Sequence, residues 1–445
     1  MFSSELYSMT KFFRKEKINY TLNTDAVYMM ALYGFLLEDT TYVNEIKKLP
    51  YSSVITYHID LNELEIEKYH SYSNEVVKIS HSDATDRINE LMEASVKRCW
   101  NKDLQYGKKH LSLLSGGMDA RTNTMIAKEL GFDNIHTITF GESASQDVRY
   151  AKKIAQGEGF NHFTRYLDNP SYLVDDIIEN YVKPVDGLMM FHTSAHTSST
   201  IRNYDTSDYS LLHTGQIGDV LFGSFAKPNF DFKANKTKIG YTGNVFDSKM
   251  LEKITVLDGI LEKYQELGAE LYSYEQRQIN ATIVGDRSLG NVIDNVSPFY
   301  DLNLINFCLS LPVEYKQNQV IYYKWLKKYH PKVLEYPWEK IQMKPNTGFK
   351  MKYGALYKKY FNGAKKYFNL KYDSMNPYSQ WIKKFPYILN MLNEIVDREM
   401  QSNKIDKELK EDLLSIYNKD IFEYRNKFAV VTALLAVNIH FGEED

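Results

Sequence analysis

The chain has 445 residues, of which 43% are hydrophobic and 25% charged, the balance of an ordinary globular protein. Its 54 Lys and Arg residues nearly match its 57 Asp and Glu residues, which excludes the strong positive field by which proteins attract nucleic acid or anionic lipid. Two cysteines, Cys99 and Cys308, exclude a disulfide framework and a four-thiolate zinc site. We recognise no signal peptide, and the longest apolar stretch, residues 428–441, is too short to span a bilayer. We therefore expect a cytoplasmic protein with no nucleic-acid or membrane partner.

The elements expected along the chain change in character after residue 83. Before it, a helix-like segment at 24–37 is followed by an alternating segment at 53–72, which predicts two strands joined by a turn at Asn62. After it, a helix at 84–100 leads into strands and helices in strict alternation. The expected strands are 110–114, 135–141 and 162–167, and the helices between them are 121–132 and 147–159. This alternation is typical of an α/β protein with a parallel sheet and crossover helices.

From about residue 250 to residue 445 the pattern is mostly helical. A run at 357–372 mixes Lys with Tyr and Phe, and without a net positive charge we interpret it as a solvated helix face.

The segment LLSGGMDAR, residues 113–121, carries the clearest chemistry, because an apolar strand gives way to a helix there. Gly116 and Gly117 allow a tight turn that presents backbone N–H groups to an anion, and the helix adds its positive dipole end. Ser115 offers a hydroxyl donor, and Asp119 a carboxylate ligand for Mg²⁺. No Gly-Lys-Ser/Thr follows, so this is not a Walker A loop. The loop predicts phosphate binding; a plain strand-to-helix turn is the alternative.

Three segments in order carry a family resemblance. LLSGGMDAR resembles the SGGxDS pyrophosphate loop of the ATP pyrophosphatase superfamily, whose members adenylate a substrate and release pyrophosphate. HTGQIGDVLFG, residues 213–223, resembles the SGxGGDELFGG segment of class B asparagine synthetases. Residues 297–312 resemble their YPFLDxxLVEFALSLP segment. The resemblance implies two domains: a truncated glutaminase-like remnant at 1–83, and an ATP-dependent ligase domain at 84–445, helical from about 250.

The resemblance implies ATP and Mg²⁺ as cofactors and assigns residues to them. Asp119 and Asp219 match the metal-ligating carboxylates. Residues implied to border the nucleotide or pyrophosphate are Leu113, Ser115, Gly116, Gly117, Asp119, Arg121, Thr139, Phe140 and Gly215. For catalysis we select Lys340, with Lys344 as second choice, to stabilise both transition states. The acidic residue that the family places between the two loops is displaced here, which leaves Glu179 and Asp186 as candidates for a general base.

The implied reaction joins a small-molecule or peptide carboxylate to an amine or ammonia through an acyl-adenylate, with release of AMP and pyrophosphate. The family's glutaminase requires a cysteine directly after the initiator methionine, where this chain has Phe2, so we expect no glutamine hydrolysis. Nitrogen then comes from ammonia, from an amine on a second or the same substrate, or from a separate glutaminase or partner subunit.

Departures from the family pattern leave a second hypothesis open. Ala120 replaces the second serine of SGGxDS, and Ile217 and Val220 replace a glycine and a glutamate around Asp219. One hydroxyl lost from a charged phosphate costs about 1.5–3 kcal/mol, which slows an enzyme without abolishing its activity. The alternative is a catalytically inactive homologue that binds a nucleotide or a partner.

Overall fold

The computed structural model describes residues 1–242, 246–345, 360, 374–420 and 423–442. Its centre is a five-stranded sheet in the order β5-β4-β3-β6-β7, and every strand pairs in parallel with its neighbours. This confirms the predicted α/β class. The strands are β3 (Lys109–Leu113), β4 (Ile135–Gly141), β5 (Asn161–Tyr166), β6 (Tyr209–His213) and β7 (Asp294–Val296).

Helices cover both faces of the sheet, as a parallel sheet requires. In β4, the sequence IHTITFG alternates β-branched and apolar residues, and six of its seven residues are buried, which suits a strand packed on both faces. The helices packed around the sheet are α3 (His81–Gln105), α4 (Met118–Glu129), α5 (Gln146–Glu158) and α6 (His192–Arg202), and the short α7 (Gly218–Leu221) follows β6.

The order of the strands fixes where ligands bind. From β3 the chain proceeds outward on one side through β4 to β5, and it later returns to β6 on the other side of β3. The loops after β3 and β6 therefore leave the same edge of the sheet in opposite directions. Such a topological switch point opens a crevice at the carboxyl ends of the strands.

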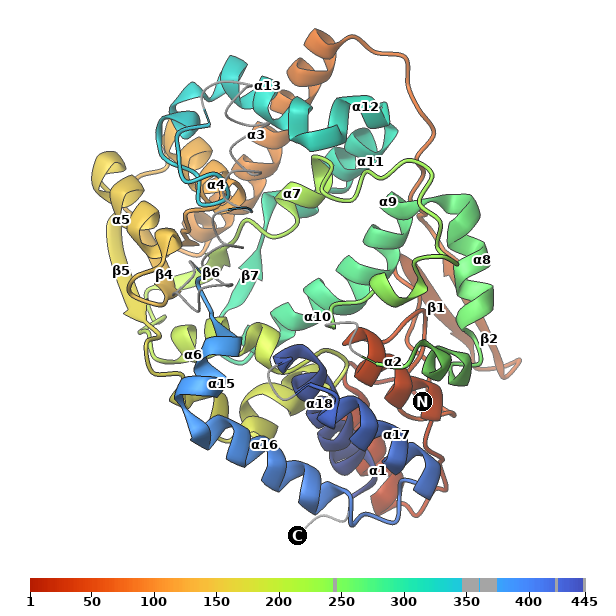
Figure 1. The fold of residues 1–445 in the computed structure, drawn as a ribbon. Coiled ribbons are helices and arrows are strands. Elements are labelled where there is room, and N and C mark those ends of the chain that lie inside the picture. Colours follow the sequence, from red (N-terminus) through yellow and green to blue (C-terminus); the bar gives the residue numbers. More distant parts are fainter. Residues whose placement is uncertain (243–245, 346–359, 361–373, 421–422, 443–445) are drawn as a thin grey trace.

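The N-terminal residues share a core with the C-terminal helices. Here α1 (Leu6–Lys15) and α2 (Thr24–Tyr33) pack against the last helix, α18 (Tyr424–Phe441), and Figure 1 shows them side by side at the lower right. The predicted strand pair is present as β1 (Ser53–His58) and β2 (Glu63–Lys68), with Asn62 at φ 52° in the turn. Residues 1–46 thus help to build the core that the C-terminal helices complete.

The second half of the chain is mostly helical, as predicted. Its helices are α8 (Leu257–Leu267), α9 (Ala269–Tyr272), α10 (Ile283–Asp286), α11 (Leu302–Ser310), α12 (Val313–Lys316), α13 (Val320–Tyr329), α15 (Tyr378–Lys384), α16 (Pro386–Glu399), α17 (Lys407–Asn418) and α18. Among the described residues, none of the helices combines the length and the apolar character that crossing a membrane requires. Apart from Tyr360, the run at 357–372 lies outside the described residues.

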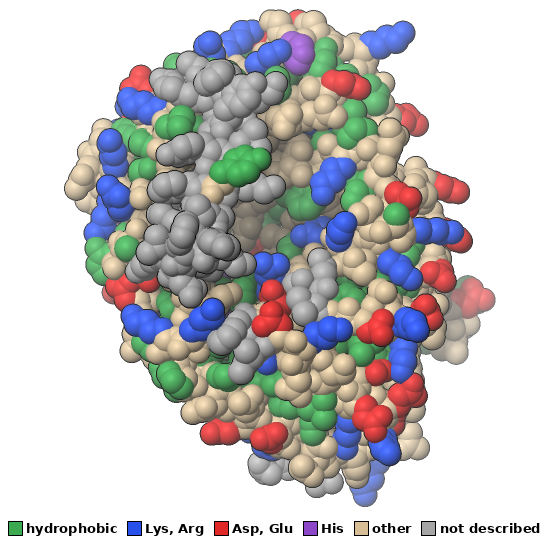
Figure 2. Space-filling view, viewed as in Figure 1, with side chains coloured by type: hydrophobic (Ala, Val, Ile, Leu, Met, Phe, Trp, Pro, Cys, Tyr) green, Lys and Arg blue, Asp and Glu red, His purple; other side chains and the backbone are tan. Residues whose placement is uncertain are grey.

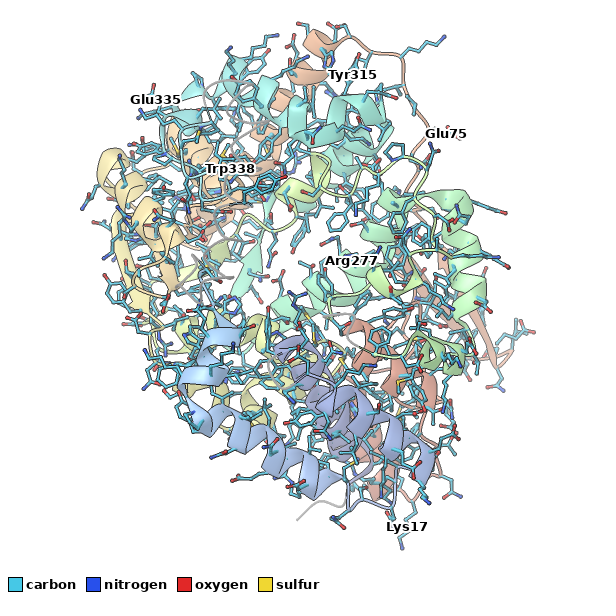
Figure 3. All side chains as sticks on the ribbon, viewed as in Figure 1. Lys17, Glu75, Arg277, Tyr315, Glu335 and Trp338 are labelled. Carbon is cyan, nitrogen blue, oxygen red and sulfur yellow. The ribbon has the colours of Figure 1, made fainter. Side chains whose placement is uncertain are left out.

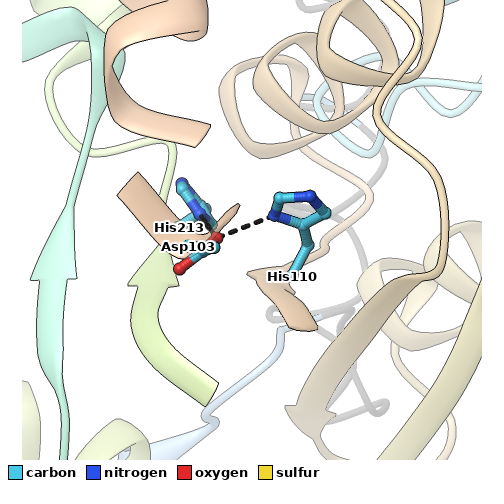
Figure 4. Close-up of side chains that lie close together, drawn as sticks. All are labelled: Asp103, His110 and His213. Carbon is cyan, nitrogen blue, oxygen red and sulfur yellow. Dashed lines mark hydrogen bonds and ion pairs between the residues drawn. The ribbon is translucent and has the colours of Figure 1, made fainter. Parts of the chain in front are cut away.

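A buried group of three side chains ties α3 to the sheet (Figure 4). Asp103 Oδ2 lies 2.8 Å from Nδ1 of His110 and 2.6 Å from Nε2 of His213, and Ser210 donates to the other carboxylate oxygen at 2.8 Å. Trp100 stacks on His213 with ring centroids 4.1 Å apart. These bonds hold the pKa of Asp103 below its usual value against the effect of burial. The group is a hydrogen-bonded brace between a helix and two strands.

Removing the shared carboxylate tests this brace. Asp103→Ala leaves two buried imidazoles and a hydroxyl without their acceptor, so we expect the free energy of unfolding to fall by about 3 kcal/mol. Urea unfolding at pH 7 measures it. Asp208→Ala is the matched control, because Asp208 pairs with Lys109 at the exposed surface. Equal stability of the two variants would contradict the assignment.

Buried neutral histidines predict how stability depends on pH. Burial lowers the pKa of His162 and His196 to about 4 and that of His192 to about 3. An unfolded histidine titrates near 6.5, so below about pH 6.5 the unfolded state takes up protons that the folded state excludes. The free energy of unfolding should therefore fall between about pH 6.5 and 4. Urea unfolding should show a smaller slope in His162→Gln than in the exposed control His58→Gln, and equal slopes would refute this origin.

Candidate nucleotide and metal site

The glycine-rich loop lies between β3 and α4, as predicted. Gly117 is the N-cap of α4, in extended backbone, and its N–H donates to Ser115 Oγ at 3.1 Å. A Cβ placed on Gly116 would lie 3.0 Å from the Asp147 Cα and 3.2 Å from the Glu339 Cβ. Close packing on two sides therefore leaves little room for a side chain at Gly116. Gly117 places the N-terminus of a twelve-residue helix at the carboxyl edge of the sheet, where an anion is favoured.

Arg121 holds this loop in place rather than pointing at an anion. Its side chain is fully buried and donates to the carbonyls of Gly116 at 2.5 Å and Gly117 at 2.8 Å. The same guanidinium also donates to the carbonyls of Val333, Tyr336 and Pro337 at 3.5, 3.0 and 2.6 Å. Burial lowers its pKa to about 10, so it stays charged at neutral pH. This corrects the prediction that Arg121 contacts phosphate.

The second loop packs directly onto the first helix. A Cβ placed on Gly215 would lie 2.3 Å from the Ala120 nitrogen, and one on Gly218 would lie 2.6 Å from the Asp119 Cγ. Only glycine permits this approach. Between them, Ile217 adopts the left-handed conformation, at φ 60°, which costs a β-branched residue about 1–2 kcal/mol. The backbone at Ile217 thus keeps the left-handed conformation that glycine favours, although the family pattern's glycine is absent here. Gly215 makes close contact with the backbone of α4, and its approach to the nucleotide stays a prediction.

Asp119 and Asp219 meet where the two loops touch. The backbone N–H of Asp219 donates to Asp119 Oδ2 at 3.0 Å, and the Tyr322 hydroxyl donates to Asp119 Oδ1 at 3.0 Å. Ser224 donates to Asp219 Oδ2 at 2.6 Å. Burial, and then the charge of Asp219, raise the pKa of Asp119 to about 8. Two partly exposed carboxylates that repel each other fit a divalent cation, and oxygen ligands are those that Mg²⁺ prefers.

Lys340 lies near this pair of carboxylates, and its role in catalysis stays a prediction. Its charge is among those that lower the pKa of Asp119, and its Nζ lies 5.2 Å from the centroid of the Trp338 ring. Figure 3 labels Trp338, which lies close to α4 and α7. The segment is held against the first loop, because the Glu339 N–H donates to the Gly116 carbonyl at 3.1 Å. Lys340 is thus an exposed cation on a fixed segment at the edge of the site, and no comparable contact singles out Lys344 among the described residues.

The other nucleotide candidates line the base of the two loops. Thr139 is buried, and its hydroxyl donates to the Leu114 carbonyl, which anchors the start of the loop on β4. Phe140 points to the opposite face, where its ring lies 5.2 Å from that of His196. Leu113 lines a cavity at the same edge of the sheet. The contact of Leu113, Thr139 and Phe140 with adenine stays a prediction.

The structure does not support either acidic residue chosen as general base. Glu179 pairs with Lys183 one helical turn away, and its side chain is 55% exposed. Asp186 is buried between elements that hold the fold together: it accepts from the Tyr7 N–H at 2.9 Å and pairs with Arg287 at 2.9 Å. Both choices rested on position in the sequence, and both side chains are committed to partners away from the two loops.

Two side chains of the site carried no recognisable sequence signal. Tyr322 comes from α13, and its fully buried hydroxyl bonds both Asp119 and Thr122. Asp286 ends α10 and accepts from Gln216 Nε2 at 3.1 Å and from the Tyr300 hydroxyl at 2.8 Å. Each lies in a helix whose sequence pattern predicts only a packed helix face. The tertiary fold is what brings the side chain to the loops.

The surface around the site is mixed in charge. On the face in Figure 2, Lys and Arg side chains alternate with Asp and Glu side chains among the described residues. The face is hollowed near its middle, where α7 and β7 lie in the same view of Figure 1. Side chains of both charge signs thus lie on the face that contains this hollow.

Comparison with known proteins agrees with this geometry. Residues 87–282, which include both loops and both carboxylates, match the family model for asparagine synthase. These residues form an asparagine synthase-like domain. A putative asparagine synthetase 1, glutamine-hydrolyzing, of Methanocaldococcus jannaschii is 22% identical over 285 residues, which are 62% of this chain and 46% of that protein. The chain thus matches about half the length of this curated relative.

Two solved structures are similar over part of the chain. The NMN synthetase of Francisella tularensis is 13% identical with a TM-score of 0.23, and the match covers 52% of this chain and 94% of that one. The NH₃-dependent NAD synthetase of Campylobacter jejuni is 13% identical with a TM-score of 0.22, and covers 48% and 95%. The family match includes the first two of the three resembling segments and confirms the resemblance to asparagine synthetases there, whereas residues 297–312 lie beyond it.

Arg121 in the asparagine synthase-like domain gives a direct test of its new role. Arg121→Lys keeps the charge but loses the planar fork, so we expect the free energy of unfolding without nucleotide to fall by about 3 kcal/mol. Lys340→Gln is the control, since it removes an exposed cation from the same site and should leave stability unchanged. A phosphate ligand would give the reverse, with intact stability and weaker binding of pyrophosphate in Arg121→Lys.

Proposed function

We propose that the chain forms an amide bond through an acyl-adenylate, consuming ATP and releasing AMP and pyrophosphate. The observation that carries this proposal is the contact between two loops at the switch point of the sheet, which brings Asp119 and Asp219 together. The asparagine synthase-like domain supports an ATP-dependent ligase at the level of the family. A carboxylate attacks the α-phosphorus of ATP, and an amine or ammonia then displaces AMP from the acyl carbon.

The residues divide this chemistry among them. Asp119 and Asp219 would hold Mg²⁺, which when bound neutralises charge on the pyrophosphate leaving group. The N-terminus of α4, with Ser115, Gly116 and Gly117, offers donors for the pyrophosphate oxygens. Lys340 would stabilise the negative charge that develops on the reacting phosphate and acyl oxygens. Positioning and electrostatics suffice for phosphoryl-type displacement, which requires little covalent chemistry from the protein.

Magnesium-dependent exchange of labelled pyrophosphate into ATP tests this function. We expect exchange in the presence of one or more members of a pool of amino, sugar and peptide carboxylates. Asp119→Asn and Asp219→Asn should each lower it about 100-fold or more, because the isosteric amide keeps the shape and removes the charge. Glu179→Gln, which changes an exposed pair, is the control and should exchange like the wild type.

Two results would overturn parts of the proposal. Full exchange in either aspartate variant would remove the metal assignment. No exchange with any carboxylate, while ATP still binds in calorimetry, would favour the alternative of a nucleotide-binding homologue without catalysis.

The nitrogen donor is an amine or ammonia rather than glutamine hydrolysed by this chain. Burial raises the pKa of the Cys308 thiol to about 12 and also raises that of Cys99, so neither provides a thiolate at neutral pH. With glutamine as the sole nitrogen source, we expect the purified chain to release no glutamate, and ammonium or an amine to restore product formation. Glutamate release that iodoacetamide abolishes would contradict this expectation.

A further inference from the structure

A cavity of about 260 Å³ adjoins the candidate nucleotide site. Thr214 and Gln216 of the second loop line it, together with part of α6 and residues 282–289. Between these two residues, Gly215 packs against the backbone of Asp119 and Ala120. Residues 214–216 therefore contact α4 on one side and line the cavity on the other.

The cavity contains a carboxylate without a counterion. Asp286 is held by hydrogen bonds from the Gln216 amide and the Tyr300 hydroxyl, both neutral donors. Among the described residues it has no ion-pair partner, and none of the cavity-lining residues described is Lys or Arg. Two other enclosed carboxylates, by contrast, have cationic partners: Asp186 pairs with Arg287 at 2.9 Å, and Glu270 pairs with Lys316 at 2.8 Å. Asp286 thus differs from them in facing open space without a cation.

The lining is negatively charged at neutral pH. Burial raises the pKa of Asp286 to about 6, against hydrogen bonds from Tyr300, Asn295 and Gln216 that favour the carboxylate. It is therefore mostly ionised at pH 7. His196 also lines the cavity, and burial lowers its pKa to about 4, so this imidazole is neutral at the same pH. Desolvation of the carboxylate is best compensated by a cationic ligand.

The other residues that line the cavity indicate which further groups the ligand carries. Ser288 is 2% exposed, and its Oγ has no hydrogen-bond partner among the described residues. Leu113, Met189 and Leu289 give the cavity apolar walls. Its volume lies below the 300–1,000 Å³ typical of pockets for drug-sized ligands, so the ligand is small.

We propose that this cavity is the acceptor subsite, and that it binds a small primary ammonium ion that also carries a hydroxyl or carbonyl oxygen. The ammonium group pairs with Asp286, the oxygen bonds Ser288, and the short carbon skeleton lies against the apolar walls. Binding of the amine stands on the cavity alone. Its part as acceptor of the acyl group rests on the proposed function, because the adjoining loop would hold the adenylate.

Calorimetric titration of the full chain with ethanolamine tests the binding. Ethylene glycol is the matched ligand, since it has the same size and hydroxyl group but no charge. We expect ethanolamine to bind at least tenfold more tightly than ethylene glycol. Asp286→Asn should lower the affinity for ethanolamine about tenfold or more, and Asp133→Asn, an exposed carboxylate just before β4, should leave it unchanged.

A second variant keeps the test decisive if Asp286→Asn fails to fold. Ser288→Ala removes only the unpartnered hydroxyl and should weaken ethanolamine binding severalfold with an unchanged melting temperature. Absence of ethanolamine binding to the wild type, equal binding of the two ligands, or wild-type affinity in a folded Asp286→Asn would each overturn the proposal.

The two hypotheses fail separately. Loss of pyrophosphate exchange with ethanolamine binding intact would refute the ligase and leave the amine site standing. Exchange without ethanolamine binding would refute the amine site alone.

Discussion

The contact between the loops after β3 and β6 is the constraint on which the site depends. Parallel neighbours bring the two loops to one edge of the sheet, but contact requires backbones without side chains, which Gly215 and Gly218 provide. The contact places Asp219 so that its own N–H bonds the Asp119 carboxylate. Two acidic groups are thereby held together, and the charge of Asp219 is one cause of the raised pKa of Asp119, a repulsion that a bound cation would relieve.

The charged residues around this contact have distinct tasks, decided by what their side chains reach. Arg121 is buried and spends its donors on backbone carbonyls, so it ties the first loop to residues 333–337. Lys340 stands on the next few residues of the same segment, exposed and close to Asp119. The buried guanidinium of Arg121 thus holds in place the segment that carries the exposed Lys340. Asp286, on the other side of the second loop, supplies a negative charge to a separate small cavity.

Local patterns in the sequence predicted the elements with strong periodicity and the loop with its special backbone. Strand 135–141 matched its predicted ends, and Ser115, Gly116, Gly117 and Asp119 occupy the expected turn. Strands β6 and β7 were not predicted, and β7 has only three residues, carries no apolar run and pairs only with β6. Glu179 and Asp186 were chosen as general bases from their position in the sequence. Position in the sequence does not determine where a side chain points. Asp286 and Tyr322 reach the site only through tertiary packing of helices.

The central step of the proposed reaction is attack of the carboxylate substrate on the α-phosphorus of ATP. A carboxylate labelled with ¹⁸O in both oxygens, chosen as one that supports pyrophosphate exchange, tests it most directly when turned over with ATP and ammonium. Adenylation transfers one labelled oxygen to the phosphorus, so mass spectrometry should find the label in AMP and none in inorganic phosphate. Label in inorganic phosphate, with ADP as the other product, would show an acyl-phosphate route and contradict the account.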